Sequence, residues 1–154
     1  MATTINNATL TVTITEDISL NNSQQGSSNS FSIASVNEVS KRILTIPAGA
    51  DTTIATFAAA VSTSAGAFDV NDVRYIRLTN LDASNSINVA LIGVSDNCQF
   101  VVPAGQSLVF GTPDDFMLGE TDTTPAFTSF EDLASIKVDS GSNAVDVELF
   151  VASV

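Results

Sequence analysis

A chain of 154 residues with 17 acidic and five basic side chains carries a formal net charge of −12. A surface this acidic repels phosphate backbones and anionic lipid headgroups, which argues against nucleic acid and against a membrane as partners. With 44% hydrophobic and 14% charged residues, the chain can bury its own core and lies far from the composition of disordered proteins. Val, Ile, Thr and Phe outnumber Lys, Arg, Gln and Glu, so the composition favours strands.

The N-terminal part opens with a loose segment and a clear strand pattern. Residues 1–8 are predicted to form a flexible arm, and they lack the basic and apolar parts of a signal peptide, so we expect synthesis in a cytoplasm. Residues 9–15 alternate strictly between threonine and aliphatic side chains, which predicts a half-buried strand. Residues 21–30 are small and polar without a pattern, which predicts a long mobile surface loop.

Further strand-like runs follow along the rest of the chain. Residues 58–67 read as a helical turn or a loop, and residues 116–118 as a short strand between acidic turns. We expect two hairpins, one from the pair 73–79 and 86–92 and one from the last two runs. Pro-Ala-Gly turns at 47–49 and 103–105 each join two strands, because proline presets φ and glycine accepts a positive φ. The runs are 31–36, 41–46, 52–57, 73–79, 86–92, 99–102, 106–110, 133–138 and 144–152.

These patterns predict an all-β protein of eight to ten short strands with closely spaced turn signals. No linker divides the chain, so residues 1–154 are predicted to form one domain. The expected architecture is an antiparallel β-sandwich of the jelly-roll type.

The residues that usually carry enzymatic chemistry are scarce. The absence of histidine removes Ser-His-Asp and Cys-His catalysis and histidine-ligated zinc, and no phosphate-cradling glycine motif occurs. Cys98 is the single cysteine, and we interpret it as a small, buried apolar residue. Paired carboxylates could hydrolyse glycosides, but the lack of tryptophan disfavours a sugar cleft. We expect no enzyme and no cofactor.

One acidic segment is a weak candidate for calcium. Asp114, Asp115, Glu120 and Asp122 lie close together in a predicted loop, and Ca²⁺ takes oxygen ligands from flexible loops. Their spacing does not match an EF-hand. The alternative interpretation is a set of solvated turn acids, without a bound metal.

Several side chains are candidate interface residues. Phe150 lies on the polar face of the last predicted strand, which indicates contact with another subunit or with a covering loop. Phe127 and Phe130, in a predicted loop, have the same interpretation. Arg74 and Arg77 are three residues apart and therefore lie on opposite strand faces. One of them is expected to point towards the core side or an interface, where it would need a carboxylate partner. The alternative is a position at a sheet edge, where the guanidinium reaches water.

Five runs of sequence between residues 73 and 154 resemble phrases found in small structural proteins of tailed bacteriophages, particularly marine and cyanobacterial phages. The runs are VRYIRLTNLD at 73–82, INVAL at 87–91, VPAGQSLVF at 102–110, LASIKVDSG at 133–141 and VELFVA at 147–152. They form a pattern of phrases and contain no catalytic signature.

The resemblance implies a virion protein, commonly a jelly-roll capsid decoration (cement) protein that is often trimeric. Such proteins bind the outer surface of the major capsid protein lattice at local symmetry axes and stabilise the head against internal DNA pressure. On this basis the expected partners are copies of the chain, as a homotrimer, and the phage major capsid protein. The expected location is the capsid exterior, after synthesis in the host cytoplasm. The alternatives are a tail, baseplate or fibre subunit of the same virion, or a sugar-binding, adhesive β-sandwich.

Overall fold

The computed structural model describes residues 5–60, 66–120 and 123–154, which form strands and loops. No described segment is a helix long and apolar enough to cross a membrane. The chain divides into two compact units, one ending at Glu38 and including Val154, and one spanning residues 39–153. We describe each unit by itself.

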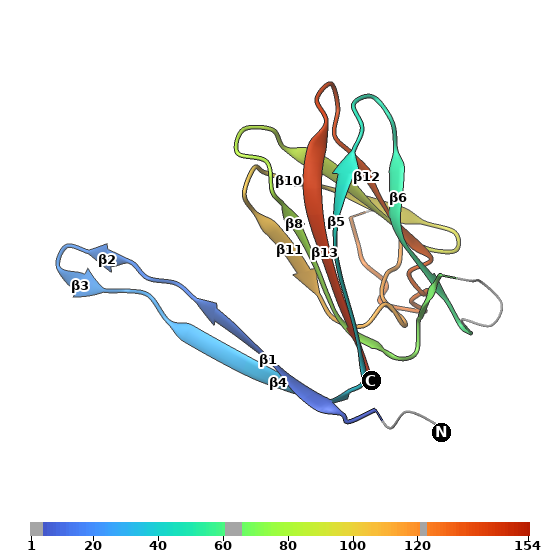
Figure 1. The fold of residues 1–154 in the computed structure, drawn as a ribbon, viewed down its shortest axis with the longest axis horizontal. Coiled ribbons are helices and arrows are strands. Elements are labelled where there is room, and N and C mark those ends of the chain that lie inside the picture. The colour runs from blue at the N-terminus through green and yellow to red at the C-terminus, as the bar shows by residue number, and fades with distance from the viewer. Residues whose placement is uncertain (1–4, 61–65, 121–122) are drawn as a thin grey trace. The chain divides into compact units, whose positions relative to one another are not determined.

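The larger unit is a sandwich of two sheets (Figure 1). One sheet has the strand order β10-β9-β12-β6-β7, and the other has the order β11-β8-β13-β5. The pairs β9–β10, β9–β12, β6–β12, β8–β11 and β8–β13 are antiparallel, and the short pair β6–β7 is parallel. The bounds are β5 (Glu38–Ile46), β6 (Thr52–Ala58), β7 (Phe68–Asp69), β8 (Val73–Asn80), β9 (Ile87–Ile92), β10 (Asn97–Val102), β11 (Ser107–Phe110), β12 (Ser135–Asp139) and β13 (Val145–Ser153).

The strand order confirms the predicted jelly roll. If the two-residue strand β7 is set aside, the first strand of the sandwich lies beside the last, and the second beside the last but one. The pairs β5–β13, β6–β12, β8–β11 and β9–β10 are therefore nested, as when one long hairpin is rolled up into two sheets. This is the connectivity of a double-sheet jelly roll.

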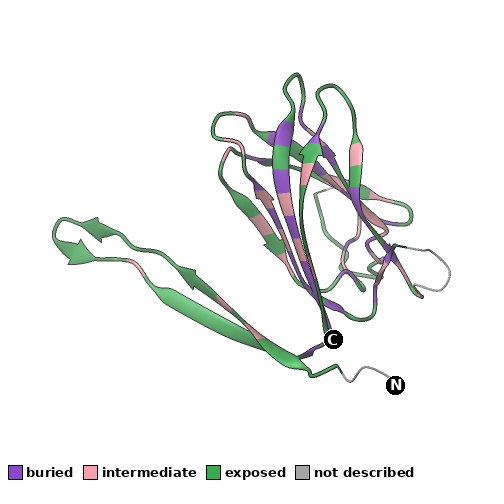
Figure 2. Cartoon of the chain, viewed as in Figure 1, coloured by how far each residue is buried: buried purple, intermediate pink, exposed green. Residues whose placement is uncertain are grey.

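The core lies between the two sheets and follows the alternation of the sequence. In β13, Val145, Val147, Leu149 and Val151 are buried, as the pattern predicts, while the residues between them face outward (Figure 2). Burying each such aliphatic side chain contributes about 1.5–3 kcal/mol. The largest fully buried side chains come from both sheets and, for Leu133, from the segment just before β12: Ile46, Ile76, Leu78, Ile87, Leu133, Ile136 and Leu149.

The two Pro-Ala-Gly turns are corners at which the chain crosses from one sheet to the other. The first joins β5 to β6 and the second joins β10 to β11, and each pair of strands belongs to different sheets. Gly49 and Gly105 have φ of 69° and 71°. A side chain resists this left-handed conformation, so glycine allows both corners.

Each corner is held by a buried polar side chain from another part of the sandwich. The side-chain amide of Asn80 donates to the carbonyl oxygens of Val102 and Pro103, both at 3.2 Å. The hydroxyl of Ser140 donates to the carbonyl of Pro47 at 3.1 Å. Asn80 and Ser140 are 0% and 5% exposed, so these hydrogen bonds satisfy polar side chains that are buried in the sandwich.

Both predicted hairpins of the C-terminal half are wrong. The strands β8 and β9 lie in different sheets, and so do β12 and β13. Alternation shows that a segment is a half-buried strand, but it does not show whether the next turn pairs the strands or crosses the sandwich. The short strand predicted at 116–118 is a single bridge between Met117 and Glu131. Residues 61–65 of the predicted 58–67 turn or loop lie outside the described residues.

The smaller unit is a two-stranded β-ribbon. β1 (Ala8–Thr15) pairs antiparallel with β4 (Ser28–Val36), and β2 (Ser19–Leu20) pairs with β3 (Ser23–Gln24) around a two-residue turn. The turn residues Asn21 and Asn22 have φ of 51° and 62°, as a type I′ turn requires. The predicted mobile loop at 21–30 is therefore wrong, because Ser28 and Ser30 pair with threonines of β1.

The division at residue 38 also differs from the predicted single sandwich with an arm at residues 1–8. The ribbon extends over residues 8–36, and its strands pair with each other and not with either sheet. Its serines and asparagines have low strand propensity, which made half of it read as a loop.

Candidate functional site

The ribbon has one apolar face and one polar face. Leu10 pairs with Ile33 and Val12 with Phe31, so aliphatic and aromatic side chains lie opposite each other on one face. The other face carries threonine and serine, including a 3.2 Å hydrogen bond between the hydroxyls of Thr11 and Ser32. We call the apolar side of Leu10, Val12, Ile14, Phe31 and Ile33 the ribbon face.

Most of the ribbon face is open to solvent. Every described residue from Ile5 to Ser35 is exposed or half-buried, and Ile14 is 51% exposed (Figure 2). A two-stranded hairpin is at best marginally stable in water, and it needs packing against another surface. The ribbon face is thus a surface that stabilises the fold only when something covers it.

A second surface is the outward side of the four-stranded sheet. The guanidinium of Arg77 on β8 lies over the ring of Phe150 on β13, with Cζ 5.9 Å from the ring centroid. Its Nη2 is 2.5 Å from Oε1 of Glu148, and Nζ of Lys41 on β5 is 3.1 Å from Oε2 of the same carboxylate. The ring of Tyr75 meets that of Phe150 edge-on at 5.9 Å.

Aliphatic side chains surround this cluster. Ile43 on β5 is 60% exposed and Val109 on β11 is 42% exposed, and Val39 is exposed as well. Val109 and Phe150 both lie opposite Arg77 in the strand register. We call this outward side the basic face after Lys41 and Arg77, and its charges balance, because Glu148 and Asp146 also face outward there.

The two cations hold the carboxyl of Glu148 in its charged form. Hydrogen bonds from Arg77 and then from Lys41 lower the pKa of Glu148 from its ordinary value. Neither Lys41 nor Glu148 was predicted as an interface residue. Their role depends on pairing between β5 and β13, which are far apart in sequence, so no local pattern signals it.

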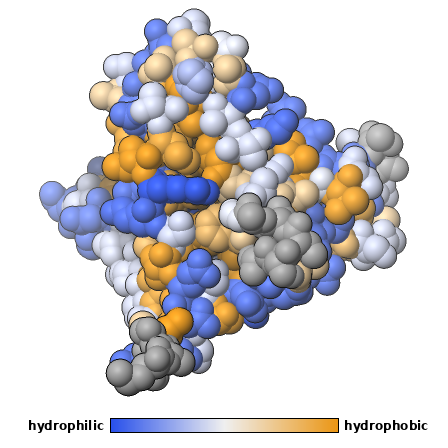
Figure 3. All heavy atoms as spheres, turned by 45° about the vertical axis from the view of Figure 1, so that its right-hand side comes forward, coloured by the Kyte–Doolittle hydropathy of each residue, from blue (hydrophilic) through white to orange (hydrophobic). Residues whose placement is uncertain are grey.

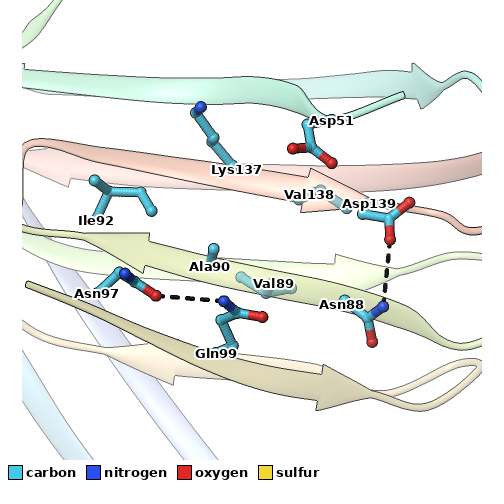
Figure 4. A pocket seen from close by; sticks show the side chains of 10 residues that line it. All are labelled: Asp51, Asn88, Val89, Ala90, Ile92, Asn97, Gln99, Lys137, Val138 and Asp139. Carbon is cyan, nitrogen blue, oxygen red and sulfur yellow. Dashed lines mark hydrogen bonds between the residues drawn. The ribbon is translucent and has the colours of Figure 1, made fainter. Parts of the chain in front are cut away.

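The five-stranded sheet carries a shallow polar groove of about 280 Å³ on its outward side (Figure 4). Amides and carboxylates from β9, β10 and β12 line it, and two of their hydrogen bonds join Asn88 to Asp139 and Gln99 to Asn97. Lys137 provides its one positive charge. No aromatic side chain is among its lining residues, whereas a sugar-binding cleft usually has an aromatic ring on which the sugar stacks.

The calcium candidates separate in the structure. Asp114 and Asp115 do come together, but with Asp132, and one oxygen of each lies within 4.8 Å of the others. Glu120 instead accepts a hydrogen bond from the backbone amide of Ala126 at 3.0 Å, and Asp122 lies outside the described residues. Asp132 is 17 residues after Asp115, so no short motif could have indicated it.

The three carboxylates repel one another. Partial desolvation raises the pKa of Asp114, and the charges of Asp115 and Asp132 raise it further. Asp132 also accepts a hydrogen bond from the backbone amide of Asp115 at 3.0 Å. Carboxylates arranged in this way suit a divalent cation, but exposed acidic groups commonly occur without one.

Phe127 and Phe130 both reach the surface. Phe127 is 74% exposed and has a φ of 49°, which is rare for a bulky residue. With Leu118 and Pro125 the two rings line a pocket of about 300 Å³. Their predicted role in an interface stays a prediction.

Arg74 and Cys98 have local roles. The guanidinium of Arg74 is exposed at the start of β8 and donates to the carbonyl of Asn71 at 2.6 Å, which fits the water-reaching interpretation of this residue. Arg77 lies on the outward side of the sheet, where it pairs with Glu148. Cys98 packs against the core, and burial raises the pKa of its thiol.

The exposed features of the described residues include several apolar surface patches. Apolar side chains reach the surface at several places in Figure 3, between polar ones. The ribbon face and the basic face combine exposed aliphatic groups with few charges, which is the chemistry of protein interfaces.

No family model matches this sequence, and no curated protein matches it. A solved chain from Bacillus endospore appendages, described as a novel family of disulfide-linked pili, aligns with this chain at a TM-score of 0.40. The two chains are 11% identical, over 75% of this chain and 85% of the other. At this level the likeness carries no argument about function.

Proposed function

We propose that this protein is a non-enzymatic virion structural protein of a tailed bacteriophage, a capsid decoration (cement) protein that binds the outer surface of the major capsid protein lattice. The observation that carries the proposal is the ribbon of residues 8–36, whose apolar face is largely exposed. A protein built in this way gains stability by assembling, because assembly removes that face from water.

Assembly on a lattice suits such a surface energetically. Each copy buries one interface, so the stabilisation of a particle is the sum over many identical sites. Mass action keeps these sites filled. The decoration protein thereby stabilises the head without any chemical step. Its location is the virion surface, on the capsid exterior, and its partners are copies of itself as a homotrimer and the major capsid protein.

The fold agrees with this role without deciding it. Jelly rolls occur in viral capsid proteins, but also in lectins and cupins, so the fold alone leaves the function open. The phage-like phrases between residues 73 and 154 favour the virion among these possibilities. Most of them lie on strands of the sandwich, where they form the core and the basic face.

The proposal is tested by adding purified protein to phage heads from which it is absent. We expect saturable co-sedimentation with the heads and a higher temperature of DNA release once the sites are filled. The polar groove provides an internal control, since an Asn97→Ala/Gln99→Ala variant should bind heads normally. If the protein binds free glycans but not heads, the adhesive alternative replaces this proposal.

A further inference from the structure

We propose that the pocket beside Phe127 and Phe130 receives a basic side chain, an arginine or a lysine, of the protein on which this chain docks. The inference rests on the proposed function, because it names the chemistry of one contact with the capsid lattice. We call this site the phenylalanine pocket, and the described residues that line it are Leu118, Glu120, Pro125, Phe127 and Phe130.

The two aromatic rings of the phenylalanine pocket are open to solvent. Phe127 is 74% exposed and Phe130 is 43% exposed. The φ of 49° at Phe127 is a conformation that a bulky residue adopts only at a cost, and such costs are commonly found at functional positions. An exposed ring contributes most when another molecule covers its face, as aromatic anchors do in protein interfaces.

The loop around the pocket is held in place by its own hydrogen bonds. The amide of Met117 donates to the carbonyl of Glu131 at 3.1 Å, and the amide of Glu131 donates back at 2.7 Å. Leu118 and Phe130, which line the pocket, are the chain neighbours of this bridged pair. The pocket of about 300 Å³ is therefore preformed, which lowers the entropy cost of filling it.

Glu120 gives the pocket a negative charge. The backbone amide of Ala126 donates to both carboxylate oxygens, at 3.0 and 3.1 Å, and so fixes the group. A carboxylate has about four acceptor positions, so a further donor can still bind. Within the described part of the chain the ion pairs are made with Glu148, and Glu120 has no lysine or arginine partner.

The surrounding sequence is acidic as well. Residues 111–134 contain six acidic side chains and no basic one. A segment of a single sign of charge attracts a cationic partner and repels an anionic one. The acids are Asp114, Asp115, Glu120, Asp122, Glu131 and Asp132.

A basic side chain matches each part of the pocket. Its cationic head is attracted to the faces of the two phenylalanine rings and forms charge-assisted hydrogen bonds with the carboxylate of Glu120. Its methylene stem packs on Leu118 and Pro125. An aliphatic side chain in the same place would remove the carboxylate from water without a partner, which is costly.

The base is more readily supplied by another protein than by a second copy of this chain. Lys137, the base that lines the polar groove, lies beside two carboxylates of that groove and would bring them to the contact. A second copy also carries a net charge of −12, which opposes its approach to an acidic loop. The other four bases already interact with groups of their own chain, and they are Lys41, Arg42, Arg74 and Arg77.

The first experiment measures binding of full-length variants to phage heads that lack the protein. Glu120→Gln removes the charge and keeps an oxygen for the amide of Ala126, and Phe127→Asn removes the ring with a residue that tolerates a positive φ. The matched controls are Glu38→Gln and Phe100→Thr, both at exposed positions outside the loop. We expect each test variant to bind about tenfold more weakly than the wild type, and the controls to bind normally.

The second experiment tests the pocket without heads. The probes are a glycine-arginine-glycine peptide with blocked ends and the same peptide with citrulline, which keeps the shape of arginine without its charge. In NMR titrations to about 10 mM, the arginine peptide should shift the amide signals of Ala126, Phe127 and Phe130, and the citrulline peptide should not. The same spectra show whether each variant is folded.

Equal shifts with both peptides would overturn the inference, because the pocket would then be an apolar site, and the absence of shifts would overturn it as well. Shifts of the same amides by calcium chloride alone would assign the pocket to a metal ion instead. Heads that bind the wild type and both test variants equally would overturn this contact and leave the proposed function intact. Heads that do not bind the wild type would contradict the proposed function, while the peptide titration still decides whether the pocket takes a cation.

Discussion

Arg77 lies over the ring of Phe150, with its guanidinium carbon 5.9 Å from the ring centroid, and the same guanidinium pairs with Glu148. The aromatic ring, the cation and the carboxylate thus hold one another on the outward side of the four-stranded sheet. The aromatic residue that interrupts the polar face of β13 therefore has partners in its own chain.

Replacing Phe150 by alanine should destabilise the fold by about 2 kcal/mol, less than the roughly 3–5 kcal/mol for a fully buried phenylalanine, because the ring is half-buried. The loss combines the edge contact with Tyr75 and the attraction to Arg77. Urea unfolding measures the change, with Phe100→Ala on the exposed edge strand β10 as the control. Equal losses in both variants would show that the cluster contributes nothing specific.

The carboxyl of Glu148 should make stability depend on acid pH. Its pKa is lowered in the fold, so its contribution is complete above the ordinary pKa of a glutamate and is lost as the pH falls through the lowered value. Glu148→Gln lacks this contribution, and the variant should be less stable than the wild type at pH 7. Denaturation series between pH 7 and pH 2 should show the two converging in acid. Curves that stay parallel would contradict the ion-pair account.

Asn80 should be the most sensitive polar residue of the sandwich. Its buried amide donates to the carbonyls of Asn85, Val102 and Pro103, and alanine would leave the buried carbonyl of Val102 without this donor. We expect a loss of about 1–3 kcal/mol, which is the cost of an unsatisfied buried group. Asn143→Ala, which removes an exposed hydrogen bond to Asn85, is the control and should change stability little in thermal melts.

The turn of the ribbon should accept glycine and reject β-branched residues. Asn22 has a φ of 62°, which glycine adopts freely and valine resists. Asn22→Gly should retain or increase the protection of β1 and β4 amides in hydrogen exchange, while Asn22→Val should reduce it. Identical protection in both variants would mean that the turn does not define the ribbon.

The sandwich was predictable where burial follows alternation. In β13 the pattern of valines and leucine correctly places four side chains in the core and Phe150 outside. The partners of each strand were less predictable, because β8 and β9 are neighbours in sequence but lie in different sheets. Pairing in a jelly roll joins distant segments, and a local period contains no information about it.

The ribbon was half missed for a different reason. Residues 9–15 were correctly predicted as a strand. The partner strand β4 begins with Ser28, Asn29 and Ser30, and these residue types usually indicate loops. Asn21-Asn22 was the available signal, because asparagine accepts the positive φ of a two-residue hairpin turn. The acidic cluster with Asp132 and the pairing of Lys41 with Glu148 had no such signal, since both arise from the tertiary fold.

Quantitative mass spectrometry of purified particles from the source tests the central claim most directly, by comparing the copy number of this chain with that of the major capsid protein. A protein that covers the capsid lattice predicts a ratio near one to one. A ratio of a few per cent would contradict decoration of the lattice and move the chain to the tail or to a single vertex. Its absence from particles would contradict a virion role altogether.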